Sequence, residues 1–282
     1  MMAEENKVIE QWWRVVRLII PYFLVVGAFQ VCGIFLLGLR FKDIGQDLPG
    51  FQSFVMMLFT TAGTFLVIWL LRKYADKGTL ASLGFKPFFE KDIFWGILMG
   101  FVIMLSGFLI LLASHQIKYL NSNFVFSELL YEFLFLTLVA FTEELVLRGY
   151  VLTNLMGSMN KYHALLVSAV LFSLMHAANA NYGWLPAVEL FFAGVLLGLS
   201  YVYTRNLWFP VALHFSWNFF QAMFGFNVSG HHIFGIISHV RERDNLWNGG
   251  AFGFEGSVLS LILQVLAIAV VYFLFRKRKV VN

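Results

Sequence analysis

The chain has 282 residues, of which 60% are hydrophobic, 18% are aromatic and only 13% are charged, and its formal net charge is +4. A soluble globular domain carries about 45–50% apolar and about 25% charged residues, so this composition excludes an ordinary soluble domain. The modest, dispersed charge does not indicate nucleic-acid binding. The single cysteine, Cys32, excludes an intrachain disulfide and a zinc site built from cysteines.

Apolar windows long enough to cross a bilayer recur along the whole chain. The sequence therefore predicts an all-α fold, a polytopic transmembrane helical bundle of about eight spans, in a single integral membrane domain over residues 1–282. The candidate spans, in chain order, are residues 16–39, 51–72, 92–114, 127–149, 163–180, 186–204, 209–227 and 257–275.

Lysine and arginine predict the orientation, because they concentrate on the cytoplasmic side of membrane proteins. With eight spans and the N-terminus inside, fifteen of the 20 basic residues fall on the cytoplasmic side. These fifteen are Lys7, Arg14, Arg17, Arg72, Lys73, Lys77, Lys86, Lys91, Arg148, Lys161, Arg205, Arg276, Lys277, Arg278 and Lys279. The five outside are Arg40, Lys42, Lys118, Arg241 and Arg243. We therefore expect a multi-pass protein of the cell membrane with both termini in the cytoplasm.

The stretch "FTEELVLRGY", residues 141–150, places three ionisable residues in an apolar segment. Such residues are costly inside a bilayer and indicate a functional site. Glu144 and Arg148 are one helical turn apart, with the acid first, and can form a pair. Glu143 projects about 100° further around the helix and has no partner within it, as a general base acting on water requires. The structural alternative is a Glu–Arg pair plus a Glu143 side chain that reaches the lipid headgroups.

Two other apolar segments carry polar residues at helical spacing. In "FSLMHAANAN", His176 follows an apolar helix, with Phe172 one turn before it. In "PVALHFSWNFF", His214 and Asn218 project from one face of the seventh span. Taken singly, each could be an interhelical hydrogen bond worth about 0.6–2 kcal/mol. Together with the two glutamates they indicate one shared site within the membrane.

Glu189 lies early in the sixth span, and we expect it to be an interfacial residue near the outer end. The other histidines fall in predicted loops or at span ends and need no special role: His115, His163, His231, His232 and His239.

Three motifs, Glu143-Glu144-x-x-x-Arg148, Phe172-x-x-x-His176 and His214-x-x-x-Asn218, resemble those of the CAAX protease and bacteriocin-processing family (CPBP, also called Abi). This family includes the type II CAAX prenyl endopeptidases. The segments "TLASLGFK" and "GVLLGLSYVYTRNLWFPVALHFSWN" are also similar to the family, and the CPBP-like core covers about residues 79–260. The resemblance implies an intramembrane endopeptidase that hydrolyses a peptide bond of a membrane-associated peptide or protein.

The resemblance also implies catalytic roles for six residues: water activation by Glu143 and His176, oxyanion stabilisation by His214 and Asn218, and support by Glu144 and Arg148. It leaves metal dependence open, because the family has been described both as metalloproteases and as a metal-independent glutamate type. Glu143, His176 and His214 could ligate zinc as a two-His, one-carboxylate set, although H-E-x-x-H is absent. No cofactor is therefore predicted, with zinc as the alternative. The expected partners are the substrate and the lipid bilayer.

Helix rise constrains how these motifs can meet. If the fourth span ended at Gly149, Glu143 would lie about 9 Å from its inner end, while His176 would lie about 20 Å from His163. The two side chains meet only if the fourth helix continues through "YVLTNLM" to about Met156. We therefore predict a long fourth helix, with Arg148 buried against Glu144. The residues predicted to share one inward-facing cavity are Glu143, Glu144, His176, His214 and Asn218.

Two other functions use similar residues. A transporter or proton relay also has buried carboxylates and histidines, but it usually carries internal repeats, and this sequence has none that is convincing. A non-catalytic membrane partner, such as a bacteriocin-immunity protein, would need the residues only for binding. Such a partner should tolerate Glu143→Gln, whereas a protease should not.

Overall fold

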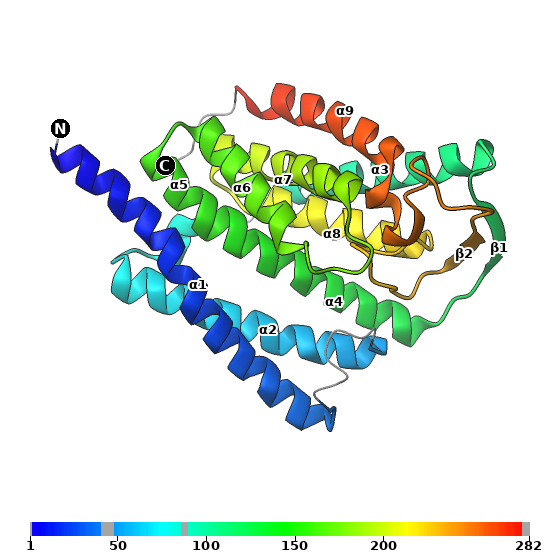
Figure 1. Ribbon diagram of the computed structural model, residues 1–282, viewed down its shortest axis with the longest axis horizontal. Helices are drawn as coiled ribbons and strands as arrows, with labels where there is room; N and C mark the ends of the chain where they lie inside the picture. The colour runs from blue at the N-terminus through cyan, green and yellow to red at the C-terminus, as the bar shows by residue number, and fades with distance from the viewer. Residues whose placement is uncertain (1, 41–47, 86–89, 278–282) are drawn as a thin grey trace.

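The computed structural model describes residues 2–40, 48–85 and 90–277. Within these ranges the protein is mostly helical, and a helix lies at each of the eight predicted spans (Figure 1). The helices are α1 (Met2–Leu37), α2 (Gly50–Leu70), α3 (Glu90–Ala113), α4 (Phe126–Glu144), α5 (Thr153–Ser158), α6 (Lys161–Met175), α7 (Trp184–Thr204), α8 (Trp208–Met223) and α9 (Val258–Phe275). A π-helix, Leu145–Leu152, joins α4 to α5 without a break. Four of the basic residues used to predict orientation lie outside the described residues: Lys42, Lys86, Arg278 and Lys279.

The long helix made of α4, the π-helix and α5 crosses the middle of the molecule (Figure 1). α2 packs along it on one side, with α1 against α2, and α8 packs along it on the other side. α3 lies along α8, while α6 and α9 both pack against α7. All eight residues of the π-helix are buried, so this segment forms the centre of the core.

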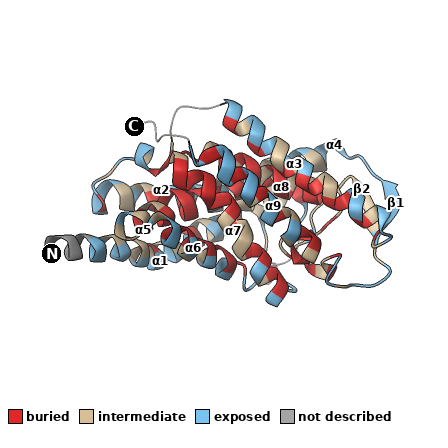
Figure 2. Ribbon diagram, turned by 90° about the horizontal axis from the view of Figure 1, so that it is seen from above, coloured by how far each residue is buried: buried red, intermediate tan, exposed pale blue. Residues whose placement is uncertain are grey.

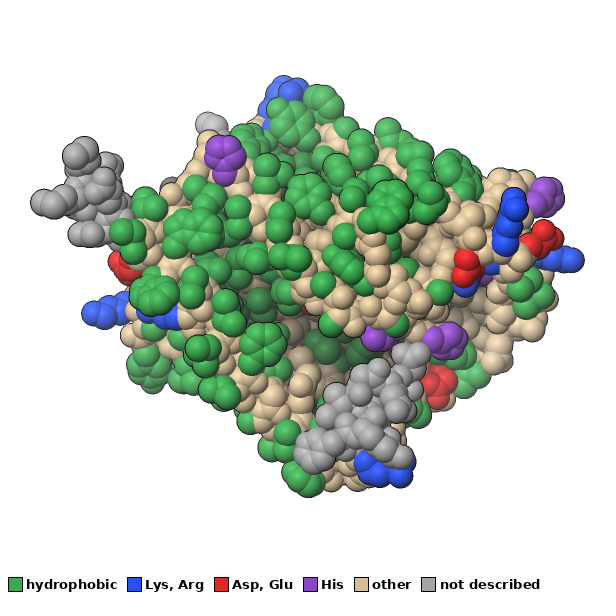
Figure 3. Space-filling view, in the orientation of Figure 1, with side chains coloured by type: hydrophobic (Ala, Val, Ile, Leu, Met, Phe, Trp, Pro, Cys, Tyr) green, Lys and Arg blue, Asp and Glu red, His purple; other side chains and the backbone are tan. Residues whose placement is uncertain are grey.

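The surface of the helical bundle is largely apolar, unlike the surface of a soluble protein. Large apolar side chains of α1, α3 and α9 face outward, while the buried residues gather in the interior of the bundle (Figure 2). Hydrophobic side chains cover most of the face seen in Figure 3. Lipid is the solvent that such a surface requires, because single molecules in water rarely expose large continuous apolar areas.

Five helices among the described residues are long and apolar enough to cross a membrane: Val8–Leu37, Gly50–Ala75, Glu90–Ala113, Trp184–Thr204 and Val258–Phe275. They identify a multi-pass membrane protein. The remaining three predicted spans are the helices that carry the polar motifs. α6 and α8 have only 15 and 16 residues, and charged residues interrupt the apolar sequence of the long central helix. Their crossing of the bilayer stays a prediction.

One small element corrects the all-α expectation. Lys118–Ser122 (β1) and Ile237–Val240 (β2) pair antiparallel at one end of the bundle (Figure 1). The two segments follow α3 and α8, which lie side by side, so their chains leave the bundle close together. Extended backbone there obtains its hydrogen bonds by pairing.

α3 and α8 approach closely because α3 presents Gly96 and Gly100 on one face. A Cβ atom added to Gly100 would lie 2.7 Å from the Cβ of Ser216. Small residues four positions apart allow such approach in membranes, where packing drives helix association. Ser216 Oγ also donates a hydrogen bond to the carbonyl of Ile97 at 2.6 Å. This contact positions α8, the helix that carries His214.

We predict that Gly100→Ala destabilises the protein and that Gly27→Ala does not. Overpacking against Ser216 should cost about 1–3 kcal/mol. Gly27, in α1, has no atom within 4 Å of an added Cβ, so alanine there should gain up to about 1 kcal/mol of helix propensity. Thermal unfolding in detergent measures the difference. Equal midpoints for the two variants would contradict a tight α3–α8 contact.

Candidate active site

The long central helix brings the first two motifs to the same depth. It continues from Phe126 to Ser158, which confirms the prediction that the fourth helix runs past Arg148. α6 ends at Met175, earlier than the predicted boundary at residue 180, so His176 follows its last helical residue. Oε2 of Glu143 consequently lies 3.9 Å from Nε2 of His176.

The helix changes to π geometry directly after Glu144. π-helical turns are rare and occur frequently at functional sites. Here the carbonyl of Arg148 accepts a hydrogen bond from Thr153 Oγ1, five residues later, at 3.3 Å. The π-helix therefore begins directly after Glu144 and contains Arg148.

Arg148 is fully buried, and both of its terminal nitrogens donate hydrogen bonds to other residues. Its Nη1 donates to Oε1 of Glu144 at 2.8 Å, and its Nη2 donates to the carbonyl of Gly194 at 3.1 Å. The guanidinium carbon also lies 4.8 Å from the centre of the Phe172 ring. The predicted burial of Arg148 against Glu144 is confirmed. A buried charge is tolerated only with partners of this kind.

Hydrogen bonds at Nδ1 determine which nitrogen of each histidine faces Glu143. Nδ1 of His214 lies 2.9 Å from Oε1 of Glu144, and Nδ1 of His176 lies 2.8 Å from the carbonyl of Phe172. Both partners are acceptors, since the carboxylate is paired with arginine, so each Nδ1 carries a proton. In the neutral form, each ring therefore presents the lone pair of Nε2 to the site.

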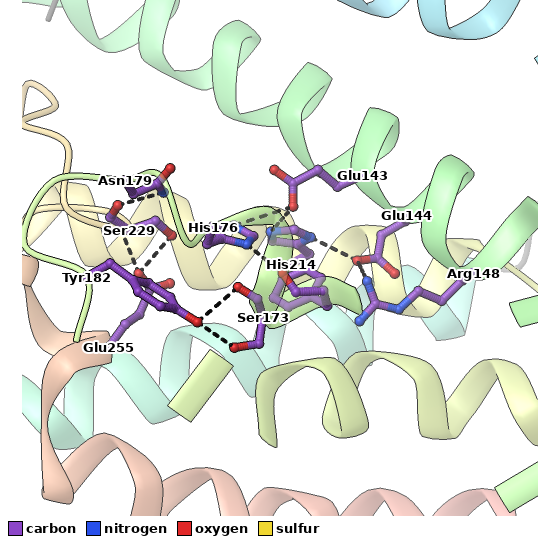
Figure 4. A network of polar contacts seen from close by, with 11 residues as sticks. Glu143, Glu144, Arg148, Ser173, His176, Asn179, Tyr182, His214, Ser229 and Glu255 are labelled. Carbon is purple, nitrogen blue, oxygen red and sulfur yellow. Dashed lines mark hydrogen bonds and ion pairs between the residues drawn. The ribbon is translucent and has the colours of Figure 1, made fainter. Parts of the chain in front are cut away.

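Glu143 faces both of these nitrogens (Figure 4). Its Oε2 lies 3.9 Å from Nε2 of His176 and 4.0 Å from Nε2 of His214, and no hydrogen-bond partner for this buried oxygen is found among the described residues. Three acceptor atoms that face one another require a hydrogen-bond donor or a cation between them. A water molecule is such a donor.

These groups line a cavity of about 350 Å³. Four of the five residues predicted to share it do so: Glu143, His176, His214 and Asn218. Glu144 does not line the cavity, which corrects the prediction. Its carboxylate points around the helix toward Arg148 and contacts His214 from behind. The catalytic roles of these residues stay predictions.

Glu189 is a second correction. It was expected at the membrane interface, but it is fully buried, and its Oε1 accepts from Ser260 Oγ and Gln264 Nε2, each at 2.6 Å. Both donors lie on α9, which covers this part of α7. Position along a span indicated depth in the membrane, whereas packing by a distant helix decided burial.

Sequence reasoning missed other groups at the site. Phe172 was noted only for its spacing, yet its ring touches Arg148 and lies 4.9 Å and 5.9 Å from the rings of His176 and His214. The hydrogen bond from Arg148 to the backbone carbonyl of Gly194 was also missed, because a motif of side chains does not indicate which backbone carbonyls lie nearby. His231 and His232, expected to have no special role, line the cavity.

Comparison with known proteins gives one family match. Residues 125–220 match the family described as type II CAAX prenyl endopeptidase Rce1-like. The chain contains an Rce1-like domain of the CPBP family. The family is one of proteases, which confirms the resemblance. No curated protein sequence gives a significant match.

The Rce1-like domain begins directly before α4 and ends within α8, so it includes all three motifs. The cavity extends beyond it. Ser229, Glu255 and Gln264 line the same cavity and lie after the matched residues.

We predict that Arg148→Met is strongly destabilising and that adding Glu144→Gln restores much of the loss. Removing one partner of a buried ion pair costs about 3–5 kcal/mol because the other charge stays buried. The amide of the second change removes that charge and keeps an acceptor for His214. Thermal unfolding of the single and double variants in detergent tests this. A double variant no more stable than Arg148→Met would show that the unpaired carboxylate is not the cause.

Proposed function

We propose that the protein is an intramembrane endopeptidase that hydrolyses a peptide bond of a membrane-associated peptide or protein. The observation that carries the proposal is the approach of His176 and His214 to within 4.0 Å of Glu143 in a mostly buried cavity. The protease family of the Rce1-like domain supports the same reaction. Hydrolysis within a membrane needs such a polar cavity, which admits a water molecule and shields developing charge from lipid.

In this proposal Glu143 is the general base. One water molecule can span the separation of about 4 Å by donating one hydrogen to Oε2 of Glu143 and the other to Nε2 of His176, with hydrogen bonds of about 2.8 Å. Both hydrogens of the water are then engaged, so its lone pairs face the scissile carbonyl. Transfer of one proton to Glu143 accompanies attack on the carbonyl carbon. When the tetrahedral intermediate collapses, the C–N bond breaks and Glu143 returns this proton to the leaving amine nitrogen.

His214 and Asn218 stabilise the oxyanion that forms. Asn218 lies one turn after His214 on α8, and both line the cavity. An asparagine amide donates in any state, whereas Nε2 of His214 donates only when its ring is protonated, because Nδ1 already carries a proton. Glu144 accepts from Nδ1 and thereby orients the ring with Nε2 toward the cavity. Glu144 and Arg148 act through His214 in this scheme.

The proposal uses no metal. The donor types suit zinc, since both Nε2 atoms are available and each Nδ1–H is held by an acceptor, as is usual for zinc-bound histidines. However, ligands of tetrahedral zinc lie about 3.3 Å apart at bond lengths of 2.0–2.1 Å, whereas the two Nε2–Oε2 separations are 3.9 and 4.0 Å. Among the described residues no group of three His, Cys, Asp or Glu side chains could hold a metal ion.

We predict that Glu143→Gln abolishes cleavage while leaving the protein folded. The amide keeps the shape of the side chain and removes the proton acceptor, so the rate should fall at least about 100- to 1000-fold, the loss seen when one oxyanion donor is removed. The matched control is Glu128→Gln, on the same helix and outside the cavity. Reconstituted protein and a cleavable membrane peptide provide the assay.

Two results would contradict this mechanism. Cleavage retained by Glu143→Gln would show that Glu143 is not the general base and that another group activates the water. Cleavage that is lost on chelation and restored by zinc would make Glu143, His176 and His214 metal ligands. We expect chelation to leave the rate unchanged.

We also propose eight spans with both termini in the cytoplasm, on the distribution of lysine and arginine. Single cysteines test this after Cys32→Ser removes the only native thiol. Arg243→Cys, in the loop between β2 and α9, should react with a membrane-impermeant reagent added outside intact cells. Lys7→Cys should react only after the membrane is opened. The reverse pattern would overturn the orientation.

A further inference from the structure

The cavity around Glu143 contains a second polar cluster. Asn179, Ser229, Glu255 and Gln264 line it, and the first three lie beyond His176 on the side away from Arg148 (Figure 4). The hydrogen bonds of these side chains in the described structure go to residues other than Glu143. The scheme for hydrolysis therefore leaves this part of the cavity unused.

Glu255 is held rigidly at this end. Its Oε2 accepts from the backbone N–H of Ser229 at 2.6 Å and from Ser229 Oγ at 3.0 Å. The carbonyl of Ser229 accepts in turn from Asn179 Nδ2 at 2.9 Å, which ties the loop after α6 to this cluster. An ionised carboxylate can accept about four hydrogen bonds. Ser229 supplies two, so Glu255 keeps acceptor capacity.

Gln264 provides a second, independent observation. Its side chain is fully buried and lines the cavity, and its Nε2 donates to Glu189. Its Oε1 has no hydrogen-bond partner among the described residues, and neither has the second oxygen of Glu189. A buried acceptor without a donor costs about 1–3 kcal/mol. A ligand that brings a donor would remove that cost.

The charges around the cavity have one sign. Glu132, Glu143 and Glu255 line it, and its described lining includes no lysine or arginine. A cavity lined by one sign of charge with apolar walls concentrates ligands of the opposite sign. The amides carry no charge, and a protonated His214 would offset only one of the three acidic side chains.

We infer that the Glu255 end of the cavity is a subsite for a cationic group of the substrate, either the side chain of lysine or arginine or the terminal ammonium of a peptide. These groups carry donors and no acceptors, which matches a wall of acceptor atoms. The inference rests on the proposed function, which makes the ligand a peptide. It specifies the class of substrate as an apolar peptide with a positive charge close to the bond that is cleaved.

Binding of three fluorescent peptides to the full-length protein in detergent tests the inference. The first is an apolar peptide with one lysine and a free N-terminus, the second has norleucine in place of lysine, and the third has an acetylated N-terminus. The protein carries Glu143→Gln so that nothing is cleaved. Each of the last two peptides lacks one positive charge of the first. We expect one of these two peptides to bind about tenfold more weakly than the first, and the charge that it lacks is then the one that occupies the subsite.

Two further variants show where the charge binds. Glu255→Gln keeps an acceptor for Ser229 and removes the charge, so it should abolish the preference for the cationic peptide without weakening the uncharged one. Gln264→Met should reduce the preference and leaves Glu255 intact, which covers the case in which Glu255→Gln fails to fold. Glu242→Gln, in the exposed loop before α9, is the matched control and should retain the full preference.

Equal affinity for all three peptides would overturn the inference, as would a preference that survives both Glu255→Gln and Gln264→Met. The proposed function fails separately. Wild-type protein that prefers the cationic peptide but never cleaves it would contradict the endopeptidase and leave the subsite standing.

Discussion

The buried pair of Glu144 and Arg148 is the interaction on which the rest of the site depends. A guanidinium in the centre of a membrane bundle needs every partner it can reach. Arg148 obtains them from the helix that carries it, from the carbonyl of Gly194 on α7 and from the ring of Phe172 on α6. Glu144 extends the network to His214 on α8. One ion pair therefore connects four helices and orients one of the two histidines.

The adjacent glutamates have opposite environments because a helix turns about 100° per residue. One rotation places Glu144 among donors that neutralise it, and the previous position leaves Glu143 facing two nitrogen lone pairs in the cavity. The carboxylate that pairs with Arg148 and His214 is suited to structure, whereas the one without an ionic partner of its own is suited to proton transfer. This contrast is the physical basis for assigning the base to Glu143 rather than to its neighbour.

The polar groups that our proposals use come from two parts of the chain. The Rce1-like domain supplies Glu143, His176, His214 and Asn218, and the segments after it supply the acceptors around Glu255. In our proposals the first part performs the reaction and the second selects the substrate. Substitutions near Glu255 could then change the preferred peptide without altering the proposed chemistry.

The sequence by itself determined the membrane class, the eight helical segments and the continuation of the central helix past Arg148, because apolar runs and helix rise are local properties. It also grouped Glu143, His176, His214 and Asn218 correctly. Only the tertiary structure decided that Glu144 faces away from the cavity and that α9 buries Glu189. The small β-sheet and the acceptors around Glu255 also required it. These features depend on which faces and loops of distant segments meet, and spacing along one helix carries no information about that.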